Sequence, residues 1–253
     1  MKEERPLILI TNDDGIYAKG LRELIDVMCL FGKVLVVAPE RAMSGMSAAV
    51  TLENPIRVSE VEKNDNYESY KCTGTPADCV KAGFNLFGER PDYVVIGINH
   101  GPNSGTNIVY SGTMGATMEG CLHGVVSIGF SLCDFDADAD FSKSKVWVAR
   151  IFQKVVEKGL PERVCLNVNI PSGEIKGVEI CRQTKGHWEE EFEKHKDPYN
   201  HDYYWLGGTF INEEPDVSGT DLCVLENQKI TIVPVKVDYT SLETVDEMRK
   251  WEF

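Results

Sequence analysis

The fold class of this chain follows from residues 7–38, which read LILITNDDGIYAKGLRELIDVMCLFGKVLVVA. Leu7–Thr11 is a compact apolar run that ends at Asn-Asp-Asp-Gly, the pattern of a buried strand that breaks into a loop. Apolar residues then recur at helical spacing as far as Gly32, namely Leu21, Leu24, Ile25, Met28 and Phe31. Residues 34–38 form a second buried strand. A strand, helix and strand in this order predict a parallel sheet.

The alternation continues along the rest of the chain. Further strands are predicted at residues 93–96, 125–131, 164–168 and 230–235. Helices are predicted from Thr75-Pro76, from near Thr113, over 145–156 and, as a short one, from Leu242. Residues 50–52 and 56–58 flank a turn at Asn54-Pro55, and residues 97–112 form a long glycine-rich loop of the length that usually has a function. The sequence therefore predicts one α/β domain.

Residues 184–212 interrupt this rhythm. They are rich in charge and carry six large aromatics, Trp188, Phe192, Tyr199, Tyr203, Tyr204 and Trp205. We expect a core of about residues 6–182 and 213–240, an arm at 184–212 and a C-terminal helix at 242–253. An exposed aromatic arm indicates an interface, so a homodimer or homotetramer is predicted. The alternative is a lid over the chain's own site.

Composition limits the partners. The net charge of −14 disfavours polymeric nucleic acid, whose binding needs a basic surface. The chain has no run of 18 apolar residues and its N-terminus does not resemble a signal peptide, so we expect a cytoplasmic protein that does not enter membranes. The eight cysteines are scattered without a Cys-x-x-Cys motif, which predicts buried free thiols.

Polar residues follow three predicted strands. These segments are Asn12-Asp13-Asp14-Gly15, Ser44-Gly45-Met46-Ser47 and Gly97-Ile98-Asn99-His100-Gly101. Strand ends of a parallel sheet collect ligands, and Gly15 lets the chain turn so that both carboxylates face one site. With a hydroxyl and an amide oxygen they make an all-oxygen set that suits Mg²⁺ or Mn²⁺ and not zinc. By itself, Asp13-Asp14 also fits a solvated turn or a helix cap.

Tyr110-Ser111-Gly112-Thr113 stands where a helix begins. Free backbone N–H groups and the positive end of the helix dipole favour an anion there, so these residues predict a phosphate cradle. The alternative is an ordinary Ser/Thr helix cap. The Gly-Lys-Ser/Thr ending of a Walker loop and the Gly-x-Gly-x-x-Gly dinucleotide fingerprint are both missing.

Several motifs in order resemble the SurE survival-protein nucleotidases. They are Ile-Thr-Asn-Asp-Asp-Gly-Ile, Val-Ala-Pro-Glu-Arg-x-x-Ser-Gly-x-Ser, Cys-Thr-Gly-Thr-Pro-Ala-Asp-Cys-Val, Gly-Ile-Asn-x-Gly-x-Asn, Tyr-Ser-Gly-Thr, Met-Glu-Gly, Tyr-Tyr-Trp-Leu-Gly-Gly and Gly-Thr-Asp. The similarity runs from residue 8 to about residue 240. Each motif is weak alone, but their order and coverage are specific.

The resemblance implies a three-layer αβα, Rossmann-like SurE fold with a mixed, mainly parallel sheet, and an arm that meets a partner subunit. It implies hydrolysis of nucleoside 5′- and 3′-monophosphates with one divalent cation, Mg²⁺ or Mn²⁺, per subunit, and in some relatives of short polyphosphate. Carried onto this chain, the metal ligands are Asp13, Asp14, Ser44 and Asn99, of which Asp13, Asp14 and Asn99 are catalytic. The phosphate-binding residues are Asn12, Gly45, Asn103, Ser111, Gly112 and Thr113.

Some questions stay open at the level of sequence. Either a water or Asp13 could attack the phosphorus. His100 lies in the site loop but is interpreted as an exposed loop histidine rather than the general acid, and Glu226-Asn227-Gln228 stands where a glycine is expected before a strand. A haloacid-dehalogenase phosphatase is a rival, but its Asp-x-Asp spacing is absent. The other rival is a nucleotide sensor without turnover.

Overall fold

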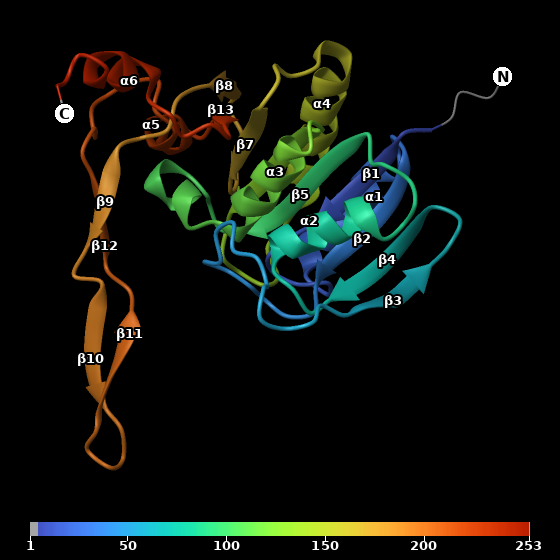
Figure 1. The fold of residues 1–253 in the computed structure, drawn as a ribbon, viewed down its shortest axis with the longest axis horizontal. Coiled ribbons are helices and arrows are strands. Elements are labelled where there is room, and N and C mark those ends of the chain that lie inside the picture. The colour runs from blue at the N-terminus through green and yellow to red at the C-terminus, as the bar shows by residue number, and fades with distance from the viewer. Residues whose placement is uncertain (1–4, 253) are drawn as a thin grey trace.

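A nine-stranded sheet forms the centre of the computed structural model, which describes residues 5–252 (Figure 1). Its strands are β1 Leu7–Thr11, β2 Lys33–Pro39, β3 Val58–Lys63, β4 Tyr67–Cys72, β5 Tyr93–His100, β6 Val126–Cys133, β7 Val164–Pro171, β8 Val178–Ile180 and β13 Ile230–Lys236. The order is β3-β4-β2-β1-β5-β6-β7-β13-β8. From β4 to β7 all neighbours are parallel, whereas β3 and β13 run antiparallel to β4 and β7. The predicted mixed, mainly parallel sheet is confirmed.

Helices cover both faces of the sheet. Helices α1 (Lys19–Met28) and α4 (Ser142–Lys158) pack on one face, and α2 (Pro76–Asn85) and α3 (Gly112–Leu122) pack on the other. Side chains of a strand alternate between faces, so Ile8 and Ile10 of β1 pack with α1 while Leu9 packs with α2. The result is the predicted three-layer αβα arrangement.

The strand order reverses beside β1. From β1 the chain moves to β2 on one side and later returns to β5 on the other side, where Ile10 pairs with Val95 and Thr11 with Ile96. In open α/β sheets ligands bind at the carboxyl ends of the strands at such a switch point. The polar segment that follows β1 and the polar segment that ends β5 therefore lie together at the carboxyl ends of these strands.

Two details of the sequence prediction were wrong. Strands β3 and β4 form an edge hairpin that the sequence analysis missed, because edge strands carry charges such as those of Glu60, Glu62 and Lys63 instead of an apolar run. Strand β5 was predicted to end at residue 96 but continues to His100. It resumes pairing with β6 at Asn99 after an irregularity in register, so Asn99 is held by the sheet and not by a loop.

The arm leaves the core as a long two-stranded ribbon (Figure 1). Strands β9 (Gly186–Glu189) and β12 (Thr209–Asn212) pair at its root, and β10 (Phe192–Lys196) and β11 (Asp202–Leu206) pair toward its tip. At the root, Trp188 packs against Phe210, and its indole N–H donates to Asn107 Oδ1 at 3.0 Å. The ribbon extends away from the sheet, so in this structure it does not cover the chain's own site. Oligomerisation stays a prediction.

Three smaller expectations can be checked. All eight cysteines are free, five of them buried. No helix within residues 5–252 is long and apolar enough to span a membrane. Gln228, which stands where a glycine was expected, adopts a left-handed φ of 57° between α5 (Asp221–Glu226) and β13. The turn thus keeps a conformation that favours glycine although the residue differs. The last helix, α6 (Leu242–Met248), buries none of its residues.

Candidate functional site

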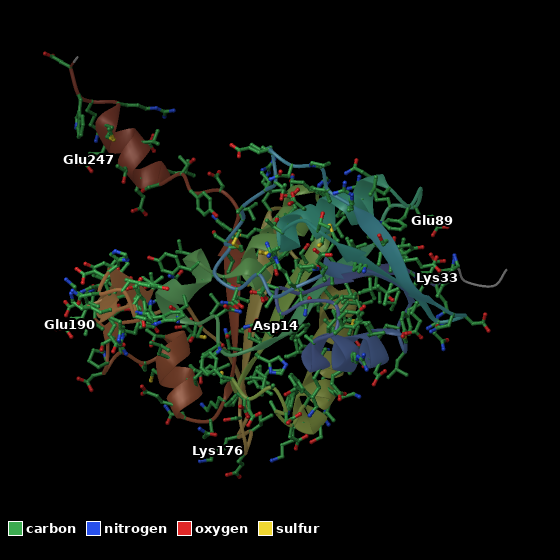
Figure 2. The ribbon with its side chains drawn as sticks, turned by 90° about the horizontal axis from the view of Figure 1, so that it is seen from below. Asp14, Lys33, Glu89, Lys176, Glu190 and Glu247 are labelled. Atoms are coloured by element: carbon green, nitrogen blue, oxygen red, sulfur yellow. The ribbon has the colours of Figure 1, made fainter. Side chains whose placement is uncertain are left out.

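Asp13 and Asp14 occupy the tight turn that follows β1. The turn is shaped by Asn12, whose buried side chain accepts from the Gly15 N–H at 3.2 Å and donates to the Gly15 carbonyl at 3.0 Å. Gly15 has a φ of 101°, as predicted for a residue that redirects the chain. Asn12 therefore supports the two aspartates, and its predicted phosphate contact stays a prediction. Figure 2 shows Asp14 near the middle of the molecule, where several elements converge.

Burial makes the charge on Asp13 costly. Its side chain is 4% exposed. Desolvation raises the pKa of Asp13 to about 6, the hydroxyl of Thr113 opposes this rise, and the charge of Asp14 adds to it. Desolvation also raises the pKa of Asp14, which is opposed by the backbone N–H of His100 at 3.1 Å from Asp14 Oδ2. Two adjacent carboxylates with raised pKa values form a place where a cation is favourable.

The loop after β2 is fixed beside these carboxylates. The Met43 N–H donates to the Asp13 carbonyl at 2.7 Å, and Ser47 Oγ donates to the Val109 carbonyl at 2.7 Å. Ser44 and Gly45 lie between these two anchors and are exposed. The loop thus contacts both the turn after β1 and the segment before α3. The hydroxyl oxygen of Ser44 is exposed to solvent.

Asn99 lies buried at the end of β5. Its Nδ2 donates to the Gly101 carbonyl at 2.7 Å, which leaves Oδ1 as the acceptor of this side chain. An amide anchored through nitrogen presents its oxygen, the atom that a hard cation prefers. The structure therefore brings Asn99 to the same strand edge as Asp13 and Asp14.

Asn103 belongs to a buried polar network that sequence analysis missed. Its backbone N–H donates to Asn169 Oδ1 at 2.7 Å, its Nδ2 donates to Ser131 Oγ at 2.8 Å, and its carbonyl accepts from Asn167 Nδ2 at 2.8 Å. Asn167 and Asn169 alternate with apolar residues in β7, and this alternation was the available signal. Because the network uses the Asn103 amide nitrogen, it fixes the loop after β5 and leaves the predicted phosphate contact to the amide oxygen.

The start of α3 faces the aspartates. Ser111 is the N-cap of this helix, and its Oγ accepts from the Met114 N–H at 3.1 Å. A side chain on Gly112 would not fit, since a Cβ there would lie 2.9 Å from Asp13 Cβ and 3.2 Å from the Met43 carbonyl oxygen. The Thr113 hydroxyl donates to Asp13 Oδ1 at 2.6 Å. The predicted cradle therefore lies against the predicted metal ligands, and its serine does cap the helix.

The residues gathered here fit a divalent cation in their chemistry. Asp13, Asp14, Ser44 and Asn99 offer carboxylate, hydroxyl and amide oxygens, which suit Mg²⁺ or Mn²⁺. Within residues 5–252, no group of three or more His, Cys, Asp or Glu side chains is arranged for a metal. A centre with only two carboxylates is consistent with that finding, because its other two ligands are neutral.

A buried carboxylate ties the site loop to the root of the arm. Asp221, which is 1% exposed, accepts from the Gly105 N–H at 2.8 Å through Oδ2. Through Oδ1 it accepts from the N–H and the hydroxyl of Thr184 at 2.9 and 2.6 Å. Asp221 lies in the Gly-Thr-Asp motif, to which sequence analysis gave no role. In the structure, Asp221 links the root of the arm to the 3₁₀ turn Gly105–Val109, which precedes α3.

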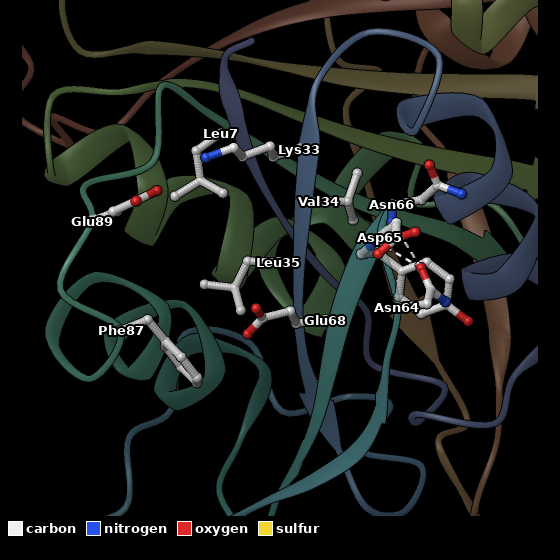
Figure 3. Close-up of a pocket in the computed structure, with 11 residues that line it drawn as sticks. Leu7, Lys33, Val34, Leu35, Asn64, Asp65, Asn66, Glu68, Phe87 and Glu89 are labelled. Carbon is white, nitrogen blue, oxygen red and sulfur yellow. Dashed lines mark hydrogen bonds between the residues drawn. The ribbon is translucent and has the colours of Figure 1, made fainter. Parts of the chain in front are cut away.

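A separate cavity of about 330 Å³ opens at the opposite end of the strands (Figure 3). Leu7 and Lys33, the first residues of β1 and β2, contribute to its wall together with Glu68, Phe87 and Glu89. It lies at the amino ends of these strands, whereas the aspartates follow the carboxyl end of β1. Figure 2 also places Lys33 and Glu89 away from Asp14. This cavity is not part of the candidate site.

Comparisons with known proteins show which family this chain resembles. The family model described as survival protein SurE matches residues 8–190. The chain is 46% identical to the 5′-nucleotidase SurE of Phocaeicola vulgatus over 99% of this chain and 98% of that protein. It is 47% identical to the protein of the same name from Bacteroides fragilis, with both chains fully covered.

A solved structure has the same fold. The crystal structure of the SurE protein from Aquifex aeolicus superposes with a TM-score of 0.82 at 34% identity, covering 96% of this chain and 98% of that chain. The match to the family model, the identity to full-length relatives and the shared fold lead to one conclusion. The chain belongs to the survival protein SurE family.

Proposed function

We propose that this protein is a divalent-metal-dependent phosphomonoesterase that hydrolyses nucleoside 5′- and 3′-monophosphates to nucleoside and phosphate. The observation that carries the proposal is the contact of Asp13, the neighbour of Asp14, with the N-terminus of α3 at the switch point of the sheet. A cation and a phosphate could bind side by side there. The relatives named 5′-nucleotidase SurE support a nucleotide as substrate.

Each part of the site has a distinct task in this proposal. Asp13, Asp14, Ser44 and Asn99 would hold one Mg²⁺ or Mn²⁺ through oxygen. A bound divalent cation would supply positive charge to the phosphoryl oxygens and make a neighbouring water more acidic. The backbone N–H groups of Gly112 and Thr113 and the hydroxyl of Ser111 would bind the phosphoryl oxygens. Gly45, Asn12 and Asn103 are the other residues predicted to bind the phosphate.

Water is the nucleophile that this geometry favours. Asp13 is almost completely buried, and one of its oxygens already accepts the Thr113 hydroxyl, which withdraws electron density from the carboxylate. An attacking carboxylate needs a free oxygen in line with the leaving group, and in this proposal the other oxygen of Asp13 holds the cation. Acid quenching during turnover tests this assignment: a phosphorylated peptide containing Asp13 in the mass spectrum would show that Asp13 attacks instead.

Phosphate release tests the function itself. Purified protein is incubated with 5′-AMP, 3′-AMP or tripolyphosphate, in each case with Mn²⁺, with Mg²⁺ or with EDTA. The proposal requires release from both nucleotides that depends on the cation, and any release from tripolyphosphate shows how far the activity extends. A nucleotide sensor without turnover is the competing function. It would bind AMP in calorimetry and release no phosphate with either metal.

A further inference from the structure

A cavity of about 450 Å³ opens beside Asp14, on the side away from α3. The residues that matter in its wall are Asp14, Tyr17, Lys19, His100, Phe135 and Asp138. Its volume is within the range of small-molecule sites. Since Asp14 also belongs to the candidate catalytic site, the cavity is continuous with that site, and a substrate bound there could extend into it.

Two exposed aromatic rings line this cavity. Tyr17 is 63% exposed and Phe135 is 80% exposed, although each is large enough to be worth burying. The ring of Phe135 nevertheless has a fixed support, because a Cβ on Gly101 would lie 2.2 Å from its Cε1. One side of this ring therefore rests on the backbone that follows β5, and much of the remainder is free for a ligand.

Hydrogen bonds hold the loop that carries Phe135. The Asp136 carbonyl lies 2.9 Å from His100 Nδ1, which must be the donor because a carbonyl only accepts. The Asp138 carbonyl accepts from Lys19 Nζ at 2.9 Å. These contacts join the loop to β5 and α1 on either side of the cavity. Phe135 is therefore presented by a braced segment, and ligand binding does not need to order the loop.

The charges on this side of Asp14 decide which part of a substrate enters. Asp14 and Asp138 contribute two carboxylates to the wall, against the single ammonium group of Lys19, which donates to the Asp138 carbonyl. A phosphate would be repelled here, whereas the helix N-terminus on the Asp13 side attracts one. The cavity suits an uncharged, flat group attached to the phosphate.

We infer that the nucleobase of the substrate binds in this cavity with its ring faces against Phe135 and Tyr17. The inference rests on the proposed function, since it assigns the two halves of a nucleotide to the two sides of the Asp13-Asp14 pair. Stacking on aromatic side chains is the usual way in which proteins hold a base without reading its edge. Phe135 and Tyr17 are thus residues of substrate binding and have no part in the chemical step.

The test compares substrates with and without a base. Steady-state kinetics are measured with AMP and with ribose 5-phosphate for the wild type, Phe135→Ala, Tyr17→Ala and the conservative variant Phe135→Tyr. The ratio of kcat/KM for AMP to kcat/KM for ribose 5-phosphate should fall by about 5- to 100-fold in each alanine variant, mainly through KM. Phe135→Tyr should keep the ratio of the wild type. Leu30→Ala removes an exposed apolar side chain just beyond the C-terminal end of α1 and is the matched control.

The outcomes separate this inference from the proposed function. An unchanged ratio in both alanine variants overturns the base site while the phosphatase activity stands. If the wild type hydrolyses neither substrate, the proposed function fails, and calorimetry with adenosine still decides the inference. Adenosine should then bind the wild type and bind Phe135→Ala at least fivefold more weakly. Equal binding to both proteins would refute the base site.

Discussion

Thr113 Oγ1 donates a 2.6 Å hydrogen bond to Asp13 Oδ1, joining two residues that are 100 positions apart in the sequence. The first residue lies in the opening turn of α3 and the second follows β1. The bond favours the charged form of a carboxylate whose pKa burial raises. This hydrogen bond therefore links the predicted phosphate cradle to the predicted cation site. A substitution in one of them should alter binding at the other.

Thr113→Val should weaken binding of the cation without leaving a cavity in the core. Valine matches threonine in shape but cannot donate to Asp13, so the charged carboxylate loses a hydrogen bond that stabilises it. A hydrogen bond to a charged group contributes about 1.5–3 kcal/mol, so the Mn²⁺ concentration for half-maximal activity should rise by about 10- to 100-fold. Thr113→Ser keeps the hydroxyl and should behave like the wild type. A Mn²⁺ titration that gives the same midpoint for all three proteins would contradict the role of this bond.

Asp14→Asn should abolish cation-dependent turnover while leaving the fold intact. The substitution removes one of only two charged ligands and keeps the size of the side chain. Activity is measured at saturating Mn²⁺, and circular dichroism checks the fold. Asp26→Asn makes the same change of charge on an exposed position of α1 and should stay fully active. Near-normal turnover in Asp14→Asn would rule out the assignment of this residue.

Ser111→Ala distinguishes phosphate binding from capping. The Ser111 hydroxyl accepts from the Met114 N–H and can still donate its own hydrogen to a phosphoryl oxygen. If it does so, turnover should fall by about 10- to 1000-fold, whereas loss of the cap alone costs roughly 1 kcal/mol of stability. Kinetics and a thermal melt are measured on the same preparation. Ser241→Ala removes the cap of α6, far from the site, and controls for capping. Unchanged kinetics with a lowered Tm would leave Ser111 as a cap only.

The stability of the metal-free protein should fall between pH 4 and pH 6 because of Asp13. The pKa of this carboxyl is about 6 in the folded protein, against 3.8 for an aspartate in the unfolded chain, so in this range the folded state binds more protons than the unfolded state. Stability from the protonated carboxyl is present below pH 4 and is lost as the pH rises through 6. The difference of about two pKa units corresponds to about 3 kcal/mol.

Asp13→Asn has no such titration and is the variant that isolates it. In EDTA, the free energy of unfolding of Asp13→Asn relative to the wild type should increase by about 2.4 kcal/mol between pH 4 and pH 7. Urea denaturation at a series of pH values measures this difference. Parallel stability profiles for the two proteins would show that Asp13 does not titrate as its burial predicts.

The tip of the arm should be removable without loss of the fold. Glu189 and Thr209 are directly paired across β9 and β12, so residues 190–208 can be replaced by Asn-Gly, which closes a two-residue hairpin. We propose that the exposed aromatics beyond this point, among them Phe192 and Trp205, hold a homodimer or homotetramer together. Light scattering should then give an oligomer for the intact chain and a monomer for the shortened one. The same mass per particle for both would exclude the tip as the interface.

The sequence by itself determined the layered core and the identity of the acidic pair. Apolar runs such as Leu7–Thr11 alternate with helical periodicity, and burial of those apolar faces permits few arrangements besides a parallel sheet covered on both sides. The same local pattern placed Asp13 and Asp14 at a strand end and Ser111 at a helix start. These features depend on neighbours within a few residues, and that information is present in a single sequence.

Tertiary structure decided the contacts that join distant segments. Asn103 meets Asn167 and Asn169 only because β5, β6 and β7 lie side by side, and Phe135 reaches the Asp14 side of the site only because its loop folds against Gly101. Hydrogen bonds and ring contacts of this kind depend on distances of a few ångströms across the fold. No periodicity or motif encodes them, because the partners are tens of residues apart and only packing of the sheet brings them together.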